Sequence, residues 1–426
     1  MLVTFSSSSV GCRGRTGSAR LPERSTGTRT VEAYTTHVSY DDKVSLPRAR
    51  AHGCHHLMGE GPDHVRTVGV EEELLLVDPE TGEPQARAAA VLARASRDGT
   101  GQDVFEKELH DEQVEFATHP QSKMADLGSE IVRCRKDAAR HAEEVGGAVV
   151  ALATSPLPVH PTITMNSRYQ WMAREFGLDT QVQLVCGCHV HVSVESEDEG
   201  VAVLDRIRPW LSVLTALSAN SPFWQGRDSG YASYRSQVWD MWPMAGPTEL
   251  FGTAERYHRY VAELTATEVV RDEGMVYFEA RLAQRYPTVE IRVADVCLHP
   301  DTAVLVAALT RGLVETAARE WRAGREPLGH TAGLLRLARW RAARSGMTEN
   351  LLDPATMRPR PADEVIHSLV DHVEEALADN GDLDLVRDSL ATLARRGNGA
   401  RVQREVMERT GSLREVVAAC VRHTQA

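Results

Sequence analysis

The sequence predicts an α+β fold in which an antiparallel sheet comes first and a helical C-terminal region follows. Runs of alternating apolar and polar residues lie between residues 66 and 296, and this period is typical of half-buried strands. After Pro300 the apolar residues recur at helical spacing. No regular strand-helix-strand alternation joins the two parts, which disfavours a doubly wound parallel sheet. We therefore expect strands that pair antiparallel, with helices flanking them.

The individual elements follow from the same patterns. Strands are expected over residues 68–77, 113–118, 182–194 and 288–296, and Asp78-Pro79-Glu80-Thr81-Gly82 gives a strong turn signal after the first. A helix capped by Ser122 is expected to run towards Val145. Further helices are expected over residues 202–219, 302–322, 332–344, 362–378, 383–395 and 401–422.

Composition excludes several classes of protein. The chain has 426 residues and a formal net charge of −12, which argues against a general nucleic-acid binder because such a protein needs a basic face. Its apolar runs are too short to cross a bilayer. Seven scattered cysteines do not form a disulfide framework, which favours a reducing, cytoplasmic location.

The first 64 residues differ from the rest of the chain. They contain eight Arg or Lys against six Asp or Glu and have no apolar periodicity. We expect a disordered extension over residues 1–63, or sequence read through from a start earlier than Met58, and one folded domain over residues 64–426.

Carboxylates gather on the first two strands. Glu71 and Glu73 are two residues apart and share one strand face, while Glu72 points to the other. Glu115 lies opposite its apolar neighbours on the second strand, and Glu108 precedes that strand. Parallel carboxylates repel one another unless a cation lies between them. One acidic strand is most simply a solvated edge, but two favour a shared carboxylate site.

The other two strands repeat this design. His189 and His191 share one face of the third strand, and Glu290 and Arg292 share one face of the fourth, with valines and isoleucine opposite. An antiparallel sheet covered by helices on one side would collect these polar faces into one concave surface. Ligands that are mostly oxygen favour Mg²⁺ or Mn²⁺ over zinc.

Three arginines are candidates for binding phosphate or a substrate carboxylate. Arg235, Arg281 and Arg292 each present a planar fork that suits bidentate contacts with oxygen anions, although surface ion pairing is the alternative for each. The sequence lacks a P-loop motif and a Rossmann glycine motif, which disfavours both modes of nucleotide binding.

Four blocks together resemble a known family. VGVEEE at residues 68–73, GCHVHV at 187–192, SPFWQG at 221–226 and TVEIRV at 288–293 occur in the order found in the type 2 glutamate-cysteine ligase family, the YbdK-like carboxylate-amine ligases. The resemblance covers about residue 65 to the C-terminus. It implies a glutamine-synthetase-like catalytic sheet that uses ATP and a divalent metal, Mg²⁺ or Mn²⁺. The implied reaction joins the γ-carboxylate of glutamate to cysteine or another small amine through an acyl phosphate, and a homodimer is implied as well.

The resemblance also implies roles for the site residues. The implied metal ligands are Glu71, Glu73, Glu108, Glu115 and Glu290, where Glu108 replaces an aspartate that related ligases often carry. His189, His191 and Arg281 are placed with the nucleotide, although the motif gives His191 no defined role. Arg235, Arg281 and Arg292 are implied to hold glutamate or the transferring phosphoryl group.

Two other classes of protein stay open at this point. The His-x-His pair with nearby acids is compatible with a zinc-dependent amidohydrolase, although that fold usually places the pair on the first strand of a β/α barrel. A catalytically silent nucleotide-binding protein on the ligase scaffold is the other alternative.

Overall fold

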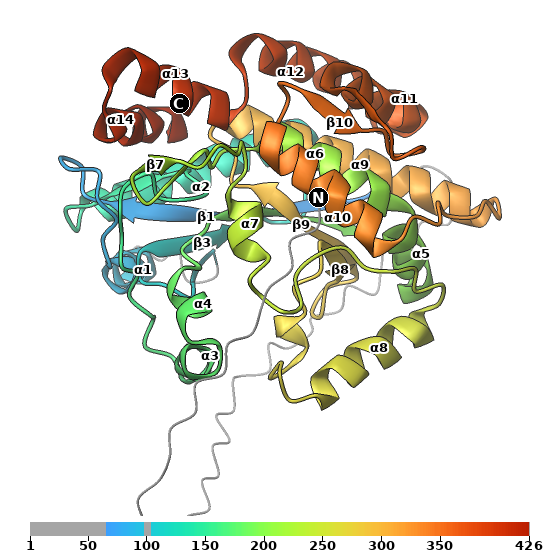
Figure 1. Cartoon of the computed structure of the whole chain (residues 1–426), viewed down its shortest axis with the longest axis horizontal. Helices are drawn as coiled ribbons and strands as arrows, with labels where there is room; N and C mark the ends of the chain where they lie inside the picture. Colours follow the sequence, from blue (N-terminus) through green and yellow to red (C-terminus); the bar gives the residue numbers. More distant parts are fainter. Residues whose placement is uncertain (1–64, 98–103, 426) are drawn as a thin grey trace, which may run out of the picture. The chain divides into compact units, whose positions relative to one another are not determined.

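The computed structural model describes residues 65–97 and 104–425, so the extension expected over residues 1–63 lies outside the described residues. In the described part, seven strands form one sheet (Figure 1). They are β1 Val68–Val77, β2 Phe105–Lys107, β3 Gln113–Ala117, β4 Ala148–Val150, β5 Gly187–Ser193, β8 Ala280–Leu282 and β9 Thr288–Asp295. The order is β2-β3-β1-β5-β9-β8, and β4 also pairs with β1.

The named strands of this sheet pair antiparallel, as predicted. β1 lies between β3 and β5, and its register places Glu73 opposite Glu115 and Glu71 opposite His189. β9 lies between β5 and β8. The predicted α+β class with an antiparallel sheet is therefore confirmed, and this pairing differs from the parallel β/α barrel of the amidohydrolase alternative.

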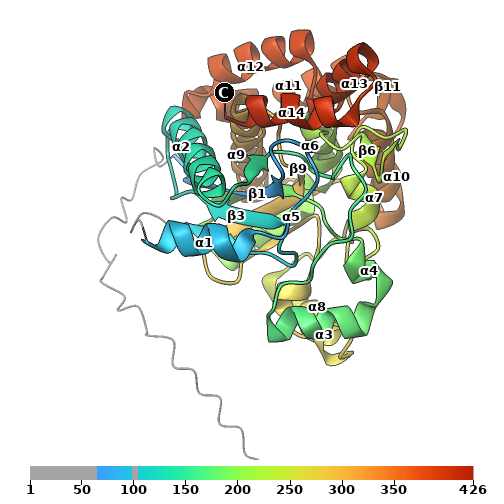
Figure 2. The same cartoon turned by 90° about the vertical axis from the view of Figure 1, so that its left-hand side faces the viewer.

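Helices cover one face of the sheet and continue to the C-terminus. The first helices are α1 Ala88–Arg97, α2 Met124–Glu143, α3 Ser167–Phe176, α4 Leu178–Gln181, α5 Glu197–Ile207, α6 Leu211–Ser218, α7 Arg235–Trp239 and α8 Ala254–Ala266. The later helices are α9 Pro300–Arg322, α10 Ala332–Ser345, α11 Ala362–Asn380, α12 Leu383–Arg396, α13 Gly399–Thr410 and α14 Leu413–Thr424. Helices α2 and α9 contact the strands, and α11 and α12 pack on α9. In both views, α3 and α8 lie on the opposite side of the sheet from α11 to α14 (Figures 1 and 2).

A buried ion pair joins the covered face of the sheet to α2. The Arg135 guanidinium donates from Nε and Nη2 to the two carboxylate oxygens of Glu72, each at 2.7 Å, and both side chains are completely buried. Arg135 also donates to the carbonyl oxygens of Cys297 and Leu298, between β9 and α9. Glu72 therefore points away from Glu71 and Glu73, as the period of a strand requires.

Four predicted boundaries were wrong. The strand expected from residue 182 begins at Gly187, because residues 178–181 form α4 and the next stretch is bound by side chains, with Gln113 Nε2 donating to the Val185 carbonyl oxygen at 2.7 Å. The helix expected over residues 202–219 is α5 and α6 joined by the 3₁₀ turn Arg208–Trp210, in which Pro209 removes a backbone donor.

The third is the last helix, expected over residues 401–422. It is split into α13 and α14 because Gly411 adopts a left-handed conformation (φ 65°) and Ser412 caps α14. The helix expected from Ser122 begins at Met124, and Lys123 occupies its N-cap. No helix among the described residues is long and apolar enough to cross a membrane.

Candidate active site

The polar face of the sheet forms one wall of a cavity of about 420 Å³. Because α2 packs against the face that carries Glu72, the cavity lies on the opposite face, on the side of α3. Nine of the residues predicted for the site line the cavity: Glu71, Glu73, Glu108, Glu115, His189, His191, Arg281, Glu290 and Arg292. The strand alternation thus brought together residues that are more than 200 positions apart in the sequence.

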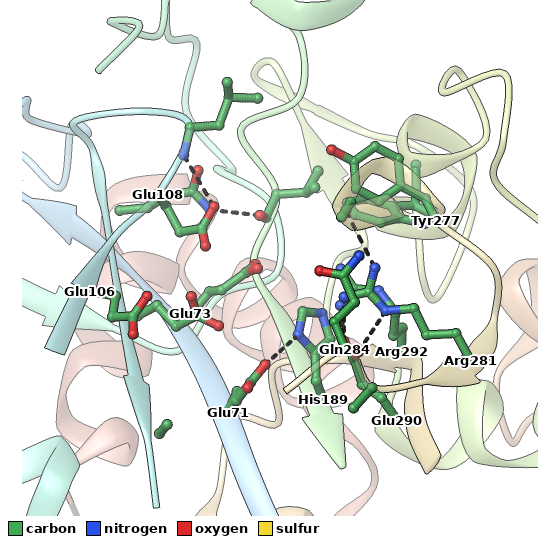
Figure 3. Close-up of a pocket in the computed structure, with 18 of the residues that line it drawn as sticks. Glu71, Glu73, Glu106, Glu108, His189, Tyr277, Arg281, Gln284, Glu290 and Arg292 are labelled. Carbon is green, nitrogen blue, oxygen red and sulfur yellow. Dashed lines mark hydrogen bonds and ion pairs between the residues drawn. The ribbon is translucent and has the colours of Figure 1, made fainter. Parts of the chain in front are cut away.

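One side of the cavity is acidic. We call the residues Glu73, Glu106, Glu108 and Glu115 the acidic wall. Figure 3 shows the labelled glutamates of this wall facing Arg281 and Arg292 across the cavity, with Glu71 and His189 between them. Glu73 is held in place by the Gly187 N–H, which donates to Oε2 at 2.6 Å. Glu108 is held by the Leu109 N–H at 3.1 Å.

Burial and neighbouring charges raise the pKa of two of these carboxylates. Burial raises the pKa of Glu73 to about 7, and the charge of Glu108 adds to the effect, while Arg235 opposes it. Burial and the neighbouring charges of Glu108 and Glu71 raise the pKa of Glu115 well above its ordinary value. Like charges in a buried site cannot all stay ionised without a compensating cation. The raised pKa values of Glu73 and Glu115 are the effect that a divalent cation bound among these carboxylates would reverse.

Glu71 links the acidic wall to the histidines. His189 Nδ1 lies 3.3 Å from Glu71 Oε2, and His191 Nε2 lies 3.1 Å from Glu71 Oε1. Burial alone would raise the pKa of Glu71, but the hydrogen bonds of both histidines outweigh it and lower the pKa well below its ordinary value. Burial lowers the pKa of His189 to about 4. His191 also contacts Thr288 Oγ1 through Nδ1 at 3.1 Å, which gives it a place beside Glu71.

The other side of the cavity carries two arginines, which both bind the carboxylate of Glu290. We call Arg281 and Arg292 the basic wall. Arg281 Nε donates to Glu290 Oε2 at 2.6 Å, and Arg292 Nη1 donates to the other oxygen of the same carboxylate. Burial disfavours the charged carboxylate, but the two guanidinium groups dominate and hold the pKa of Glu290 far below its ordinary value. Arg281 is further fixed by the Val276 carbonyl oxygen at 3.2 Å.

The donor set suits a divalent cation. Two groups have ligand atoms within 4.8 Å of one another: Glu71, His189 and Glu290, and Glu73, Glu115 and His189. His189 belongs to both groups, and its buried Nε2 has no hydrogen-bond partner among the described residues. Carboxylate oxygens with one imidazole suit Mg²⁺ or Mn²⁺ better than zinc, because structural zinc sites are rich in nitrogen and sulfur ligands. The residues present therefore fit the predicted metal.

Arg235 differs from the other predicted site residues because it does not line the cavity. Its guanidinium lies over Gly187, on the face of β5 that also carries His189: a Cβ at that glycine would be 2.4 Å from Arg235 Nη2 and 3.1 Å from His189 Nε2. The side chain is 2% exposed, and Nη1 and Nη2 face the Arg292 carbonyl oxygen at 3.5 and 3.4 Å. The predicted direct contact of Arg235 with substrate stays a prediction that this placement does not support.

Several lining residues were missed by the sequence analysis. Glu106 lies on the three-residue strand β2, Arg168 and Tyr169 lie on α3, and Trp239 and Tyr277 come from short or irregular segments. The segments that carry Glu106, Trp239 and Tyr277 are too short or irregular to show a clear period, whereas the ten-residue α3 was not predicted. Only the alternation of Glu106 and Glu108 across the start of the second acidic cluster gave a usable signal.

Solved structures with a similar fold include ligases. The crystal structure of glutamate–cysteine ligase from Francisella tularensis in complex with AMP aligns with a TM-score of 0.61 at 13% identity, over 84% of this chain and 88% of that chain. A bifunctional glutathione synthetase from Pasteurella multocida aligns with a TM-score of 0.62 at 16% identity, over 84% of this chain and 52% of that chain. At these identities the likeness defines the class of fold.

Sequence comparison narrows the class to a family. The model of glutamate-cysteine ligase family 2 (GCS2) matches residues 67–419, and the chain belongs to this family. A protein of Streptomyces avermitilis with the provisional name glutamate–cysteine ligase 2-1 is 70% identical over 361 residues, which is 85% of this chain and 100% of that protein. A similarly named protein of Streptomyces coelicolor is 68% identical over 362 residues, again 85% of this chain and 100% of that protein.

Proposed function

We propose that this protein is an ATP-dependent ligase that joins the γ-carboxylate of L-glutamate to the amino group of cysteine or another small amine. The family and the names of its relatives support the reaction class. AMP in the structurally similar ligase supports a nucleotide substrate. The observation that carries the proposal is the single cavity in which an acidic wall faces a basic wall.

The carboxylates on both sides of His189 would hold the divalent cation. The ligand atoms would come from Glu71, Glu73, Glu115, Glu290 and His189. A bound Mg²⁺ or Mn²⁺ would neutralise negative charge on the phosphates of ATP and orient them. Glu108 would shape the same charge field, because its carboxylate is close enough to raise the pKa of both Glu73 and Glu115.

The basic wall would act on the transferring phosphoryl group. A γ-carboxylate oxygen of glutamate attacks the γ-phosphorus of ATP, the bond to the bridging oxygen breaks, and ADP leaves. Negative charge on the equatorial oxygens needs fixed cationic donors, which Arg281 and Arg292 provide. The amine nitrogen then attacks the acyl carbon, phosphate leaves with the former carboxylate oxygen, and a carboxylate of the acidic wall takes the amine proton.

The described thiols near the site do not offer a nucleophile for a different mechanism. Cys186 is buried, and burial raises the pKa of its thiol well above the ordinary value. The pKa of Cys188 is also raised well above its ordinary value, first by its hydrogen bond with Cys297 and then by burial. Thiols that stay protonated are poor nucleophiles and poor metal ligands. This environment agrees with direct attack of substrate on substrate.

The experiment is hydroxylamine trapping. Incubation with ATP, Mg²⁺, glutamate and hydroxylamine should give γ-glutamyl hydroxamate, because this small nucleophile intercepts an acyl phosphate when the natural amine is unknown. At the same Mg²⁺ concentration, Glu290→Gln should lower the yield of product at least about tenfold, and Glu263→Gln, at an exposed position of α8, is the matched control. Hydroxamate from another carboxylate donor would keep the reaction class and replace glutamate.

Assays of hydrolysis and of ADP release separate the alternatives. Hydrolysis that needs stoichiometric zinc and no ATP would support the amidohydrolase reading. ATP binding without ADP release across a panel of amines would support a silent nucleotide-binding protein. The homodimer stays a prediction, which the molar mass in solution tests.

A further inference from the structure

Trp239 contacts two of the three arginines that were predicted for the site. The Cζ atom of Arg235 lies 5.4 Å from the centroid of the indole ring, and the Cζ atom of Arg292 lies 5.6 Å from it. Arg235 and Trp239 are four residues apart on α7, which places them on the same helix face. Arg292 reaches the same ring from β9. One aromatic side chain thus joins a buried arginine over Gly187 to an arginine that lines the cavity.

The buried Arg235 has weak hydrogen bonds, and its charge is compensated by the nearby carboxylates of Glu73 and Asp295 together with the Trp239 ring. The guanidinium is almost completely buried, and its Nε has no hydrogen-bond partner among the described residues. Its two contacts with the Arg292 carbonyl oxygen are long, at 3.4 and 3.5 Å. A buried cation costs free energy unless nearby groups compensate for lost water. The face of an indole ring supplies such compensation, and more so when the contact is desolvated.

Arg292 uses the ring for orientation. Its Nη1 binds Glu290, but its buried Nε has no partner among the described residues, so the fork is held on one side only. The ring of Trp239 is itself fixed by Tyr277, with centroids 5.1 Å apart at an interplanar angle of 61°. Both aromatic residues line the cavity. A ring held in this way defines where the second side of the Arg292 guanidinium can lie.

We propose that Trp239 is a positioning residue of the site: its ring holds Arg292 against Glu290 and Arg235 against Gly187. The kinetic part of this inference rests on the proposed function, because it takes Arg292 to stabilise the transferring phosphoryl group. Loss of the ring face then lowers kcat more than it raises KM, since the guanidinium matters most when charge develops in the transition state.

The first test measures the contact without any turnover. In double-mutant cycles on the unfolding equilibrium, Trp239→Leu should couple to Arg292→Met, with an interaction factor of about fivefold in the unfolding constant. Arg281→Met is the matched control, because Arg281 binds the same carboxylate of Glu290 but approaches from β8. Equal coupling to both arginines, or none to Arg292, would overturn the proposal.

The second test uses the hydroxamate assay. We expect Trp239→Leu to lower kcat about tenfold while KM for glutamate changes less than threefold, and Trp239→Phe, which keeps an aromatic face, to recover most of the loss. Trp171→Leu is the control, since Trp171 packs in the same aromatic cluster but contacts Phe176. A comparable kcat loss in Trp171→Leu, or no rescue by phenylalanine, contradicts positioning. If the unsubstituted protein makes no hydroxamate, the proposed function fails and the unfolding cycles alone decide this inference.

Discussion

Glu73 and Glu115 are direct register partners across β1 and β3, so two glutamates face each other on the buried polar side of the sheet. An antiparallel pair normally places opposite charges or apolar groups at such positions, because like charges destabilise it. Here burial and the charge of Glu108 raise the pKa of Glu73 to about 7, and burial with the charges of Glu108 and Glu71 raises the pKa of Glu115 well above its ordinary value. Such a pair destabilises the fold and offers carboxylate ligands to a cation.

Cation binding should therefore release protons. As pH increases towards 7, the apparent affinity for Mg²⁺ should rise at least about tenfold per pH unit, because the cation must displace a proton from Glu73. Isothermal titration in two buffers of different ionisation enthalpy measures the protons released. Glu73→Gln should flatten the pH dependence, whereas an unchanged slope in that variant would assign the protons to other groups.

The same carboxylates should make the protein without metal less stable as pH rises. A carboxylate whose pKa is higher in the folded than in the unfolded state stabilises the fold at low pH, and this contribution is lost as pH rises through the folded value. For Glu73 that window runs from about 4.5 to about 7. We expect Tm with chelator to fall between pH 5 and pH 8, and Mg²⁺ to raise Tm more at pH 8 than at pH 5. A Mg²⁺ effect that is equal at both values would contradict this.

Glu290 and Arg292 share a strand face but should respond differently to metal. Glu290→Gln keeps the size of the side chain and removes its charge, so apparent Mg²⁺ affinity should fall at least about tenfold, and excess Mg²⁺ should restore part of the activity. Arg292→Lys keeps the charge and loses the fork, so added metal should not help. Activity curves against Mg²⁺ for both variants make the comparison, and identical curves would argue against separate roles.

Glu71 and Glu72 are neighbours on β1, but their side chains lie on opposite faces of the sheet. Removing the partner of Glu72 by Arg135→Met leaves a buried charge without compensation and should lower the free energy of unfolding by about 3 to 5 kcal/mol. Glu71→Gln should change stability less and weaken metal binding more. Chemical denaturation and metal titration of the two variants test this contrast, and a larger loss of metal affinity in Arg135→Met would reverse the assignment.

The alternation of residues along strands was sufficient to predict most of the site. Because side chains alternate strictly between the two faces, the sequence placed Glu71 with Glu73 and His189 with His191 before any contact between strands was known. The antiparallel order then brought Glu71 opposite His189 and Arg281 opposite Glu290. The side chains of both register pairs are also in contact, and Arg281 with Glu290 forms an ion pair.

Residues outside regular strands could not be predicted in the same way. Trp239 lies at the end of a five-residue helix, and its role depends on Arg292, which is 53 positions away along the chain (292 − 239). Arg235 looked like a substrate ligand, but the absence of a side chain at Gly187 lets its guanidinium lie against the backbone of β5, where it is buried. Such placements depend on tertiary packing, which local periodicity does not encode.

Residues 1–57 should be dispensable for the reaction. The family match begins at residue 67, and the close Streptomyces avermitilis relative is covered completely by 85% of this chain. A chain that starts at Met58 should keep its Tm within about 2 °C and its hydroxamate activity within about twofold, because less than 0.5 kcal/mol is expected from segments outside the core. A larger loss in either measurement would show that the extension contributes to the folded domain.

The central claim is that glutamate is activated by phosphorylation of its γ-carboxylate in the cavity between the acidic and basic walls. Glutamate labelled with ¹⁸O in the γ-carboxylate tests it most directly, with mass spectrometry of the phosphate and nucleotide products formed in the presence of ATP, Mg²⁺ and hydroxylamine. The account predicts one ¹⁸O atom in each inorganic phosphate released and unlabelled ADP. Label in AMP, or unlabelled phosphate formed together with hydroxamate, would contradict an acyl phosphate.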